Sequence, residues 1–268
     1  MFLDKMQQIK ESIFSKKSAL VAFSGGVDSS VLAKLAYDAL GDYVLAVTIN
    51  MYSLPAQEIQ KAKDVAREIG IKHRIVNFDE FKILGFVENS PQRCYHCKKS
   101  ILEILLKIAC KEGYSVLIEG TNITETLGNR PGMQAVLEMG EVVMSPFIQF
   151  SVTKSEIRQM AEYMGLTVAD KPSSPCLASR IPYGRQITKE GISRVKFAEE
   201  YLSTLVFSQF RIRDHGDIAR IEITSSDLQR ILENKDEIVH QLKSLGFYYV
   251  TLDLEGFRSG SLDEVISK

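Results

Sequence analysis

The sequence contains no long apolar run and no block of like charge. No stretch approaches the roughly 20 apolar residues that a membrane-spanning helix needs, and residues 1–5 do not begin an apolar signal segment. The 33 Lys and Arg residues nearly balance the 34 Asp and Glu residues, which leaves a formal net charge of −1. We therefore expect a cytoplasmic protein that has no membrane partner and no strong non-specific affinity for nucleic acid.

Cysteine is scarce too, with four residues in 268. In a reducing compartment such thiols stay unpaired, so they favour metal binding or catalysis over disulfides. The chain is long enough for one large domain or for two smaller ones.

The most informative segment is residues 24–30, Ser-Gly-Gly-Val-Asp-Ser-Ser. It follows an apolar run at 19–23 and precedes a helical pattern at 31–36, an order that is typical of a phosphate site. Glycine lets the backbone approach an anion, and a helix N-terminus presents unpaired N–H groups. A carboxylate beside phosphates needs a cation, so we interpret Asp28 as a Mg²⁺ partner or an orienting group. The predicted nucleotide-binding residues here are Ser24, Gly25, Gly26, Asp28, Ser29 and Ser30.

Other glycine-rich phosphate motifs fit this segment poorly. The common P-loop requires a lysine, and the dinucleotide fingerprint requires G-x-G-x-x-G; neither is present. A plain turn with helix-capping Asp and Ser remains an alternative. The string S-G-G-V-D-S resembles the PP-loop of ATP pyrophosphatases, which split ATP between the α and β phosphates and adenylate a substrate.

Strand and helix patterns alternate in the first part of the chain. Strands are predicted at 44–49, 73–76, 115–119 and 142–144, and helices at 55–70, 100–112 and 153–165. This alternation predicts an α/β fold with a parallel, doubly wound sheet, in which ligands bind at the carboxyl ends of the strands. Asn122 follows one such strand, so it is a candidate nucleotide-binding residue, or else a turn cap.

The pattern changes at residues 171–185, which are rich in Pro and Ser and are predicted to form a linker loop. Beyond it, helices at 189–205 and 226–245 and strands at 209–213, 219–223 and 248–254 predict a small α+β unit with an antiparallel sheet. The expected domains are therefore 1–170 and 186–268, joined by the linker at 171–185.

The cysteines divide into two groups. Cys94 and Cys97 form a C-x-x-C pair just before the helix predicted at 100–112, and Cys176 lies in the linker, whereas Cys110 falls within that helix as a small core or boundary residue. The first three could ligate a metal together. A structural zinc site, a redox pair, a 4Fe-4S cluster with one open iron and unremarkable thiols all remain possible, because spacing alone does not choose among them.

Taken together, these segments resemble the LarE family of ATP-dependent sulfur transferases, which build the nickel-pincer cofactor of lactate racemase. The resemblance covers nearly the whole chain and is carried by residues 24–29, a turn expected at 130–132, and residues 176–184, 211–215, 218–222 and 252–260. It implies that ATP adenylates a carboxylate of pyridinium-3,5-biscarboxylic acid mononucleotide and releases pyrophosphate. A sulfur nucleophile then displaces AMP and leaves a thiocarboxylate.

The resemblance also implies the sulfur source. Some members sacrifice one cysteine, which corresponds to Cys176, but those members lack the C-x-x-C pair. Members with three cysteines hold a 4Fe-4S cluster whose open iron carries a sulfide, so Cys94, Cys97 and Cys176 are the implied ligands, with Cys176 and Asp28 as the catalytic residues. A sulfide donor and a homo-oligomer, a hexamer in this family, are implied as partners.

Polar residues of the second domain fit a substrate that carries a phosphate. Arg211 and Arg213 alternate on one strand and therefore share a face, where two guanidinium groups suit a phosphate. Arg180 is a further phosphate or carboxylate candidate. Glu200 and Glu222 are candidates for binding the substrate or a metal. A solvated strand face and surface salt bridges are the alternatives for these residues.

Two other functions compete with sulfur transfer to a small molecule. A tRNA thiolation enzyme can combine a PP-loop with a three-cysteine cluster, but the nearly neutral charge makes a nucleic-acid partner the weaker hypothesis. A noncatalytic nucleotide or iron–sulfur sensor would bind ATP without releasing pyrophosphate.

Overall fold

The chain forms two compact units in the computed structural model, which describes residues 2–126, 131–171, 175–207, 209–258 and 260–265. Unit 1 comprises Met1–Ile83 and Gln92–Ser174, and unit 2 comprises Leu84–Pro91 and Pro175–Lys268. The predicted linker, 171–185, spans the junction between them. Residues 84–91 belong to unit 2, although the sequence pattern assigns them to the first domain.

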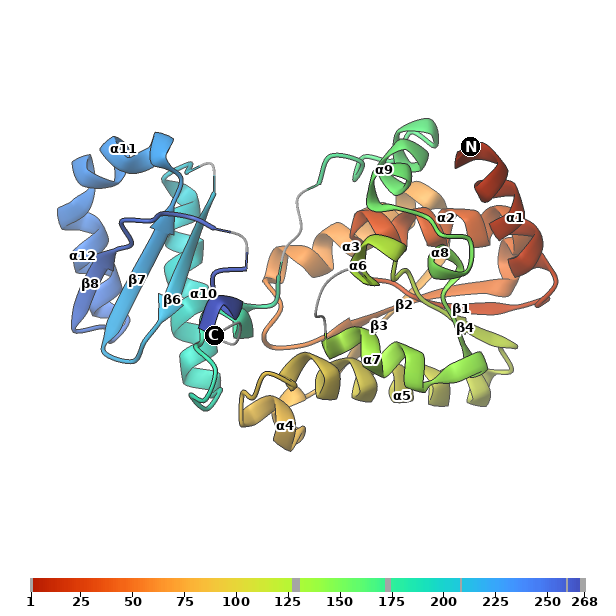
Figure 1. Ribbon diagram of the computed structural model, residues 1–268, viewed down its shortest axis with the longest axis horizontal. Helices are drawn as coiled ribbons and strands as arrows, with labels where there is room; N and C mark the ends of the chain where they lie inside the picture. The colour runs from red at the N-terminus through yellow and green to blue at the C-terminus, as the bar shows by residue number, and fades with distance from the viewer. Residues whose placement is uncertain (1, 127–130, 172–174, 208, 259, 266–268) are drawn as a thin grey trace. The chain divides into compact units, whose positions relative to one another are not determined.

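Unit 1 contains the parallel, doubly wound sheet that the sequence predicts. Its strands lie in the order β3-β2-β1-β4-β5, and every neighbouring pair is parallel (Figure 1). The order therefore reverses beside β1, which is where such sheets bind ligands. The strands are β1 (Ala19–Ala22), β2 (Val44–Asn50), β3 (Lys72–Asn77), β4 (Val116–Ile118) and β5 (Val143–Met144).

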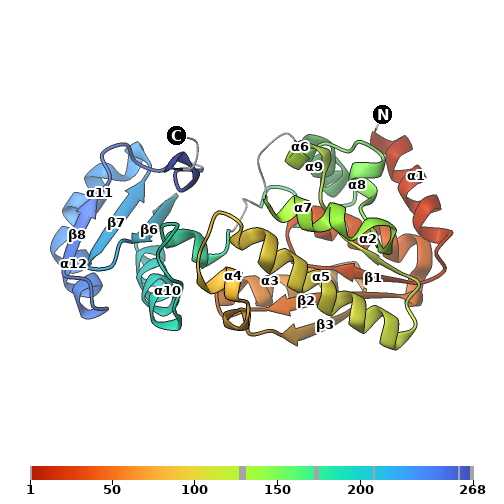
Figure 2. The same cartoon turned by 60° about the horizontal axis from the view of Figure 1, so that its bottom comes forward.

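Helices cover both faces of this sheet because successive strand residues point to opposite sides. Val21 packs with α1, α2, α3 and α9 on one face, and Leu20 packs with α5 and α7 on the other (Figures 1 and 2). The principal helices of the unit are α1 (Phe2–Phe14), α2 (Val27–Leu40), α3 (Ala56–Ile69), α5 (Arg93–Glu112), α7 (Pro131–Glu138) and α9 (Lys154–Tyr163), with the short α6 (Ile123–Thr126) and α8 (Pro146–Gln149).

Three local predictions in unit 1 are wrong. Helix α5 begins at Arg93, seven residues before the predicted start, so Cys94 and Cys97 lie inside it. Cys110 is exposed and not a core residue. Residues 130–132 were expected to form a turn, but Pro131 and Gly132 begin α7, while Arg130 lies outside the described residues.

Unit 2 is a small α+β unit with a mixed sheet. Strand β6 (Phe210–Asp214) is antiparallel to β7 (Ile218–Ile223), but β8 (Tyr249–Leu252) runs parallel to β7, so the expectation of an antiparallel sheet is wrong. A helical crossover returns the chain to the same end of the sheet, as a parallel pair requires. This crossover contains α11 (Leu228–Glu233) and α12 (Lys235–Ser244), which are separated at Asn234, where one continuous helix was expected.

Unit 2 also contains α4 (Leu84–Val87), the 3-10 turn η4 (Leu177–Arg180) and α10 (Lys189–Thr204). Asn89, which follows α4, ties its segment to the linker region, since its Nδ2 donates to the carbonyls of Pro182 and Arg185 at 2.8 Å each. Among the described residues of the chain, no helix is long and apolar enough to cross a membrane.

Candidate active site

The loop after β1 takes its shape from two glycines with different roles. Gly25 has a φ of +70°, and a Cβ at this position would lie 2.7 Å from the Cα of Ala62, so the loop packs directly against the backbone of α3. Gly26 is the N-cap of α2 and has no side chain to cap the helix. The first N–H groups of α2 are therefore available to an anion.

The serine hydroxyls of the loop bind within it. Ser29 Oγ and Ser30 Oγ donate to the carbonyl of Gly26 at 3.1 and 2.8 Å, and the N–H of Ser24 donates to Ser29 Oγ at 3.2 Å. These bonds hold the loop in one conformation. The predicted nucleotide-binding residues thus lie in the turn after β1, at 24–26, and in the first turn of α2, at 27–30.

Asp28, in the first turn of α2, lies at the centre of a polar network. Asn122 Nδ2 donates to Asp28 Oδ1 at 3.0 Å, so the structure brings these two predicted site residues together. The amine of Lys154, the first residue of α9, forms an ion pair with the same carboxylate. Gly120 lets the loop after β4 lie close to the backbone of α2, because a Cβ at this position would lie 3.2 Å from the backbone carbon of Asp28. The sequence analysis missed both Lys154 and Gly120.

Glu119, directly after β4, is the second carboxylate of the site. Unlike Asp28, it was not predicted from the sequence. It accepts hydrogen bonds from Lys98 Nζ at 3.1 Å, from Ser145 Oγ at 2.6 Å and from both the N–H and the hydroxyl of Thr121. Burial alone would raise the pKa of Glu119. The positive charge of Lys98 and the hydrogen bonds of its neighbours outweigh burial, and the pKa lies below its usual value. Glu119 is therefore a charged anchor that fixes the amine of Lys98.

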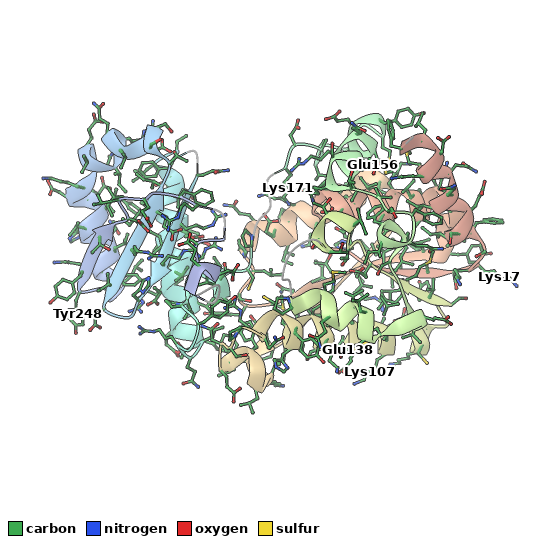
Figure 3. All side chains as sticks on the ribbon, viewed as in Figure 1. Lys17, Lys107, Glu138, Glu156, Lys171 and Tyr248 are labelled. Carbon is green, nitrogen blue, oxygen red and sulfur yellow. The ribbon has the colours of Figure 1, made fainter. Side chains whose placement is uncertain are left out.

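Lys171 closes the far side of the loop. Its amine donates to Glu58 Oε2 at 2.9 Å and to the carbonyl of Gly25 at 3.3 Å, and Figure 3 labels it on the segment that follows α9. Burial would raise the pKa of Glu58, but the amines of Lys171 and Lys61 outweigh it, so the pKa of Glu58 is lowered. Lys171 thereby joins the glycine loop to α3.

These groups surround a cavity of about 640 Å³ at the carboxyl ends of β1, β2 and β4. Its lining includes four acidic and four basic side chains, so their formal charges cancel. A nucleotide triphosphate that enters this cavity would bring uncompensated negative charge, which a bound Mg²⁺ would offset. The charged lining residues are Asp28, Glu58, Glu119, Glu125, Lys98, Lys154, Arg158 and Lys171.

The C-x-x-C pair lies on α5 beside this cavity. Cys94 and Cys97 are three residues apart in the helix and therefore share a face. Cys97 Sγ lies 3.9 Å from the sulfur of Met51, a residue of the cavity lining. A Cβ on Gly132 would lie 3.5 Å from the carbonyl oxygen of Cys94, an ordinary contact distance, so α7 packs against the first turn of α5 at this point. Within the described residues, no group of three or more His, Cys, Asp or Glu side chains is arranged to hold a metal ion.

In unit 2, Cys176 directly precedes the turn η4 and is partly exposed. Arg180, at the end of that turn, is 3% exposed and forms a two-pronged ion pair with Glu199, with Nε–Oε1 and Nη2–Oε2 distances of 2.8 and 2.9 Å. Glu199 lies in α10. The sequence analysis named the adjacent Glu200 as a candidate and not Glu199. Glu200 is exposed on the same helix.

The strand arginines of unit 2 have different surroundings. Arg213 is buried and pairs with the fully buried Glu222, with Nε–Oε1 and Nη2–Oε2 distances of 2.9 and 2.8 Å. Arg211 lies over the ring of Phe257, with its guanidinium carbon 5.1 Å from the ring centroid. Burial lowers the pKa of Arg211, and the charge of Arg180 lowers it further.

The fold and the loop define a class. An open parallel sheet that reverses order beside S-G-G-V-D-S, with the loop opening a helix at a charged cavity, is an α/β domain of the PP-loop ATP pyrophosphatase type. In agreement, residues 3–107 match the sequence model of a family described as NAD synthase.

Comparison with individual proteins narrows this class. The chain is 37% identical over 249 residues to pyridinium-3,5-bisthiocarboxylic acid mononucleotide synthase of Lactiplantibacillus plantarum, covering 92% of this chain and 90% of that one. It is 39% identical to an uncharacterized protein of Synechocystis sp. over the full length of both. It is 28% identical to a tRNA-specific 2-thiouridylase of Wolbachia pipientis, over 68% of this chain and 58% of that one. The chain belongs to the LarE family and is an ATP-dependent sulfur transferase.

Proposed function

We propose that this enzyme adenylates a carboxylate of pyridinium-3,5-biscarboxylic acid mononucleotide, releases pyrophosphate and replaces AMP with sulfur, which gives a thiocarboxylate. The product is proposed from the name of the L. plantarum relative, and the substrate from the family resemblance. The observation that carries the adenylation step is the Gly25-Gly26 loop, which directs the start of α2 toward the charged cavity of unit 1.

The first step is an attack of the substrate carboxylate on the α-phosphorus of ATP. A bond forms between the carboxylate oxygen and phosphorus, the bond from phosphorus to the bridging α–β oxygen breaks, and pyrophosphate leaves. Main-chain N–H groups at the start of α2 would hold the charge of the phosphates. Lys98, Lys154 and Lys171 would join them once each amine exchanges its carboxylate partner for a phosphate oxygen. Mg²⁺ held by Asp28 would neutralise part of that charge.

For the second step we propose that Cys94, Cys97 and Cys176 ligate a 4Fe-4S cluster. Two thiols on one face of α5, one of them against the cavity lining, support this assignment. When bound, the cluster would supply a transferable sulfide on its fourth iron. A sacrificial Cys176 is the alternative. The physiological sulfide donor would be a separate molecule, and we also propose a homo-oligomer, a hexamer as in the resembling family.

Iron and acid-labile sulfide analysis under anaerobic conditions tests the cluster. We expect about four iron atoms per chain in the parent protein, and a loss of most of this iron in Cys94→Ser, Cys97→Ser and Cys176→Ser. Cys110→Ser is the matched control, because Cys110 is an exposed thiol on the same helix as the pair. Parental iron in Cys94→Ser would contradict the assignment. So would an iron-free parent that turns over once and leaves Cys176 as dehydroalanine.

Pyrophosphate release tests the substrate. We expect release from ATP that depends on the pyridinium mononucleotide, together with a thiocarboxylate product identified by mass spectrometry. Thionucleosides in tRNA that form only with this protein present, without a thiocarboxylate product, would contradict the proposal and favour tRNA thiolation. ATP binding without pyrophosphate release in the presence of any substrate would contradict catalysis.

A further inference from the structure

Two side chains and one main-chain N–H donate hydrogen bonds to the main chain around Cys176. The carbonyl of Cys176 accepts hydrogen bonds from Ser179 N at 3.0 Å, Ser179 Oγ at 2.7 Å and Arg180 Nη1 at 3.4 Å. Arg180 Nη1 also donates to the carbonyl of Pro175 at 3.2 Å. One guanidinium thus binds the carbonyl of the peptide bond that precedes Cys176 and the carbonyl of the one that follows it.

Arg180 is itself fixed by Glu199. The two-pronged pair orients the guanidinium plane, and Glu199 Oε1 also accepts the N–H of Ile212 in β6 at 3.1 Å. A continuous set of hydrogen bonds therefore runs from the sheet of unit 2 through one carboxylate and one guanidinium to the backbone of Cys176. A planar fork with five donors suits this task better than a lysine would.

A second ion pair supports the other end of the turn. Arg213 Nη1 donates to the carbonyl of Ser179 at 2.7 Å, while its other two nitrogens bind Glu222. Ser261 Oγ accepts from Arg213 Nη2 at 2.8 Å and donates to Glu222 Oε1 at 3.1 Å. All three nitrogens of each arginine, Arg180 and Arg213, thus have acceptors within the protein.

We propose that Glu199 is a positioning residue for Cys176. The Arg180–Glu199 pair, together with the Arg213–Glu222 pair, forms a clamp on the backbone of residues 175–179 that presents the Cys176 sulfur in a fixed place for sulfur transfer. That the clamp serves sulfur transfer rests on the proposed function. That it holds the backbone of residues 175–179 in place does not. Arg180 and Arg213, which the sequence analysis assigned to substrate, then act mainly through the turn that carries the cysteine.

Thiol alkylation tests the clamp directly. The full-length, metal-free protein is treated with iodoacetamide, and the rate at each cysteine is followed by peptide mass spectrometry, with the exposed Cys110 of unit 1 as an internal reference. In Glu199→Gln we expect alkylation of Cys176 to become faster by about threefold or more, because the turn opens more often, with the rate at Cys110 unchanged.

Arg194→Lys is the matched control. Arg194 is also a residue of α10, and its side chain forms a two-pronged ion pair with Asp214, a buried carboxylate of β6. None of the hydrogen bonds of Arg194 reaches residues 175–180. We expect this variant to lose thermal stability and to alkylate Cys176 at the parental rate. Should Glu199→Gln fail to fold, Ser179→Ala removes one donor to the Cys176 carbonyl and should accelerate alkylation in the same direction, by a smaller factor.

Parental alkylation rates at Cys176 in both Glu199→Gln and Ser179→Ala would overturn the clamp. Equal acceleration in Arg194→Lys would also overturn it, because the effect would then be general loosening of unit 2. The assay uses neither ATP nor iron, so failure of the cluster assignment would leave this result standing. A slow sulfur step in Glu199→Gln with parental pyrophosphate release would support both proposals together.

Discussion

Replacement of Gly25 by alanine should destabilise unit 1 far more than the same replacement at Gly26. Gly25 has a φ of +70°, which costs an alanine about 1–2 kcal/mol. The new Cβ would also lie 2.7 Å from the Cα of Ala62, a backbone atom of α3 that cannot rotate away. Overpacking of this kind costs about 1–3 kcal/mol, so we expect a total near 3 kcal/mol.

Gly26 is the matched control in the same loop. Its φ is −81°, and a Cβ there would meet Ser24 Oγ at 3.4 Å, an ordinary contact distance. The remaining cost is that of alanine at an N-cap, about 1 kcal/mol. Both variants remove one glycine hydrogen, so they differ mainly in backbone conformation and in the contact with α3.

Thermal unfolding followed by circular dichroism measures the difference. For a unit of this size, 1 kcal/mol corresponds to about 2–4 °C, so Gly25→Ala should lower the midpoint of unit 1 by about 6–12 °C. Gly26→Ala should lower it by about 4 °C or less. Equal midpoints for the two variants would refute the close approach of the loop to α3.

Two further predictions concern the cavity carboxylates. Asp28→Asn should abolish pyrophosphate release, while its circular dichroism spectrum stays the same as that of the parent protein. Full release by this variant would contradict the proposal that Asp28 binds Mg²⁺. Glu119→Gln should cost about 2–4 kcal/mol at neutral pH, because Lys98 loses its buried partner. Since the folded pKa of Glu119 is lowered, its contribution is present above the unfolded pKa and is lost as pH falls toward the folded one. The midpoint of Glu119→Gln should therefore fall less than that of the parent as the pH is lowered below about 4.5, and parallel curves would contradict this.

The parts of the site that are local in sequence could be predicted. Residues 19–36 contain the strand, the glycine turn and the helix start in one contiguous stretch, and each has a distinct residue pattern. The parallel sheet followed from the alternation of elements, and Asn122 was placed at the ligand edge because it follows a buried strand. Its hydrogen bond to Asp28 agrees with that placement.

The partners of the carboxylates could not be predicted, because they are remote in sequence. Lys154 binds Asp28, 126 positions away, and Lys171 binds Glu58, 113 positions away. Each of these lysines looks like an ordinary surface charge when only its sequence neighbours are considered. A signal was present for Lys154, since it follows β5 and opens a helix with a capping box, which places it at the same edge of the sheet.

Predictions from periodicity failed where tertiary packing decides the outcome. The helix at 100–112 was recognised from its apolar face, but its first turns, Arg93 to Lys99, are polar, and their helical form is favoured by packing against α7 at Gly132. Likewise, the parallel pairing of β8 with β7 depends on the path of the crossover, which a strand pattern does not encode.

Among the arginines predicted to bind substrate, Arg211 has the surroundings that an anion site requires. Arg180 and Arg213 each face a carboxylate at under 3 Å, so their charge is already balanced. Arg211 lies over the ring of Phe257 and donates to the carbonyl of Phe210 at 2.6 Å, which is neutral. Burial and the charges of Arg180 and Arg213 lower the pKa of Arg211, although Glu199 and Glu222 act in the opposite direction, so burial costs its charged form free energy. A phosphate beside Arg211 would offset that cost, whereas one beside Arg180 would first have to displace Glu199 and release the turn that carries Cys176.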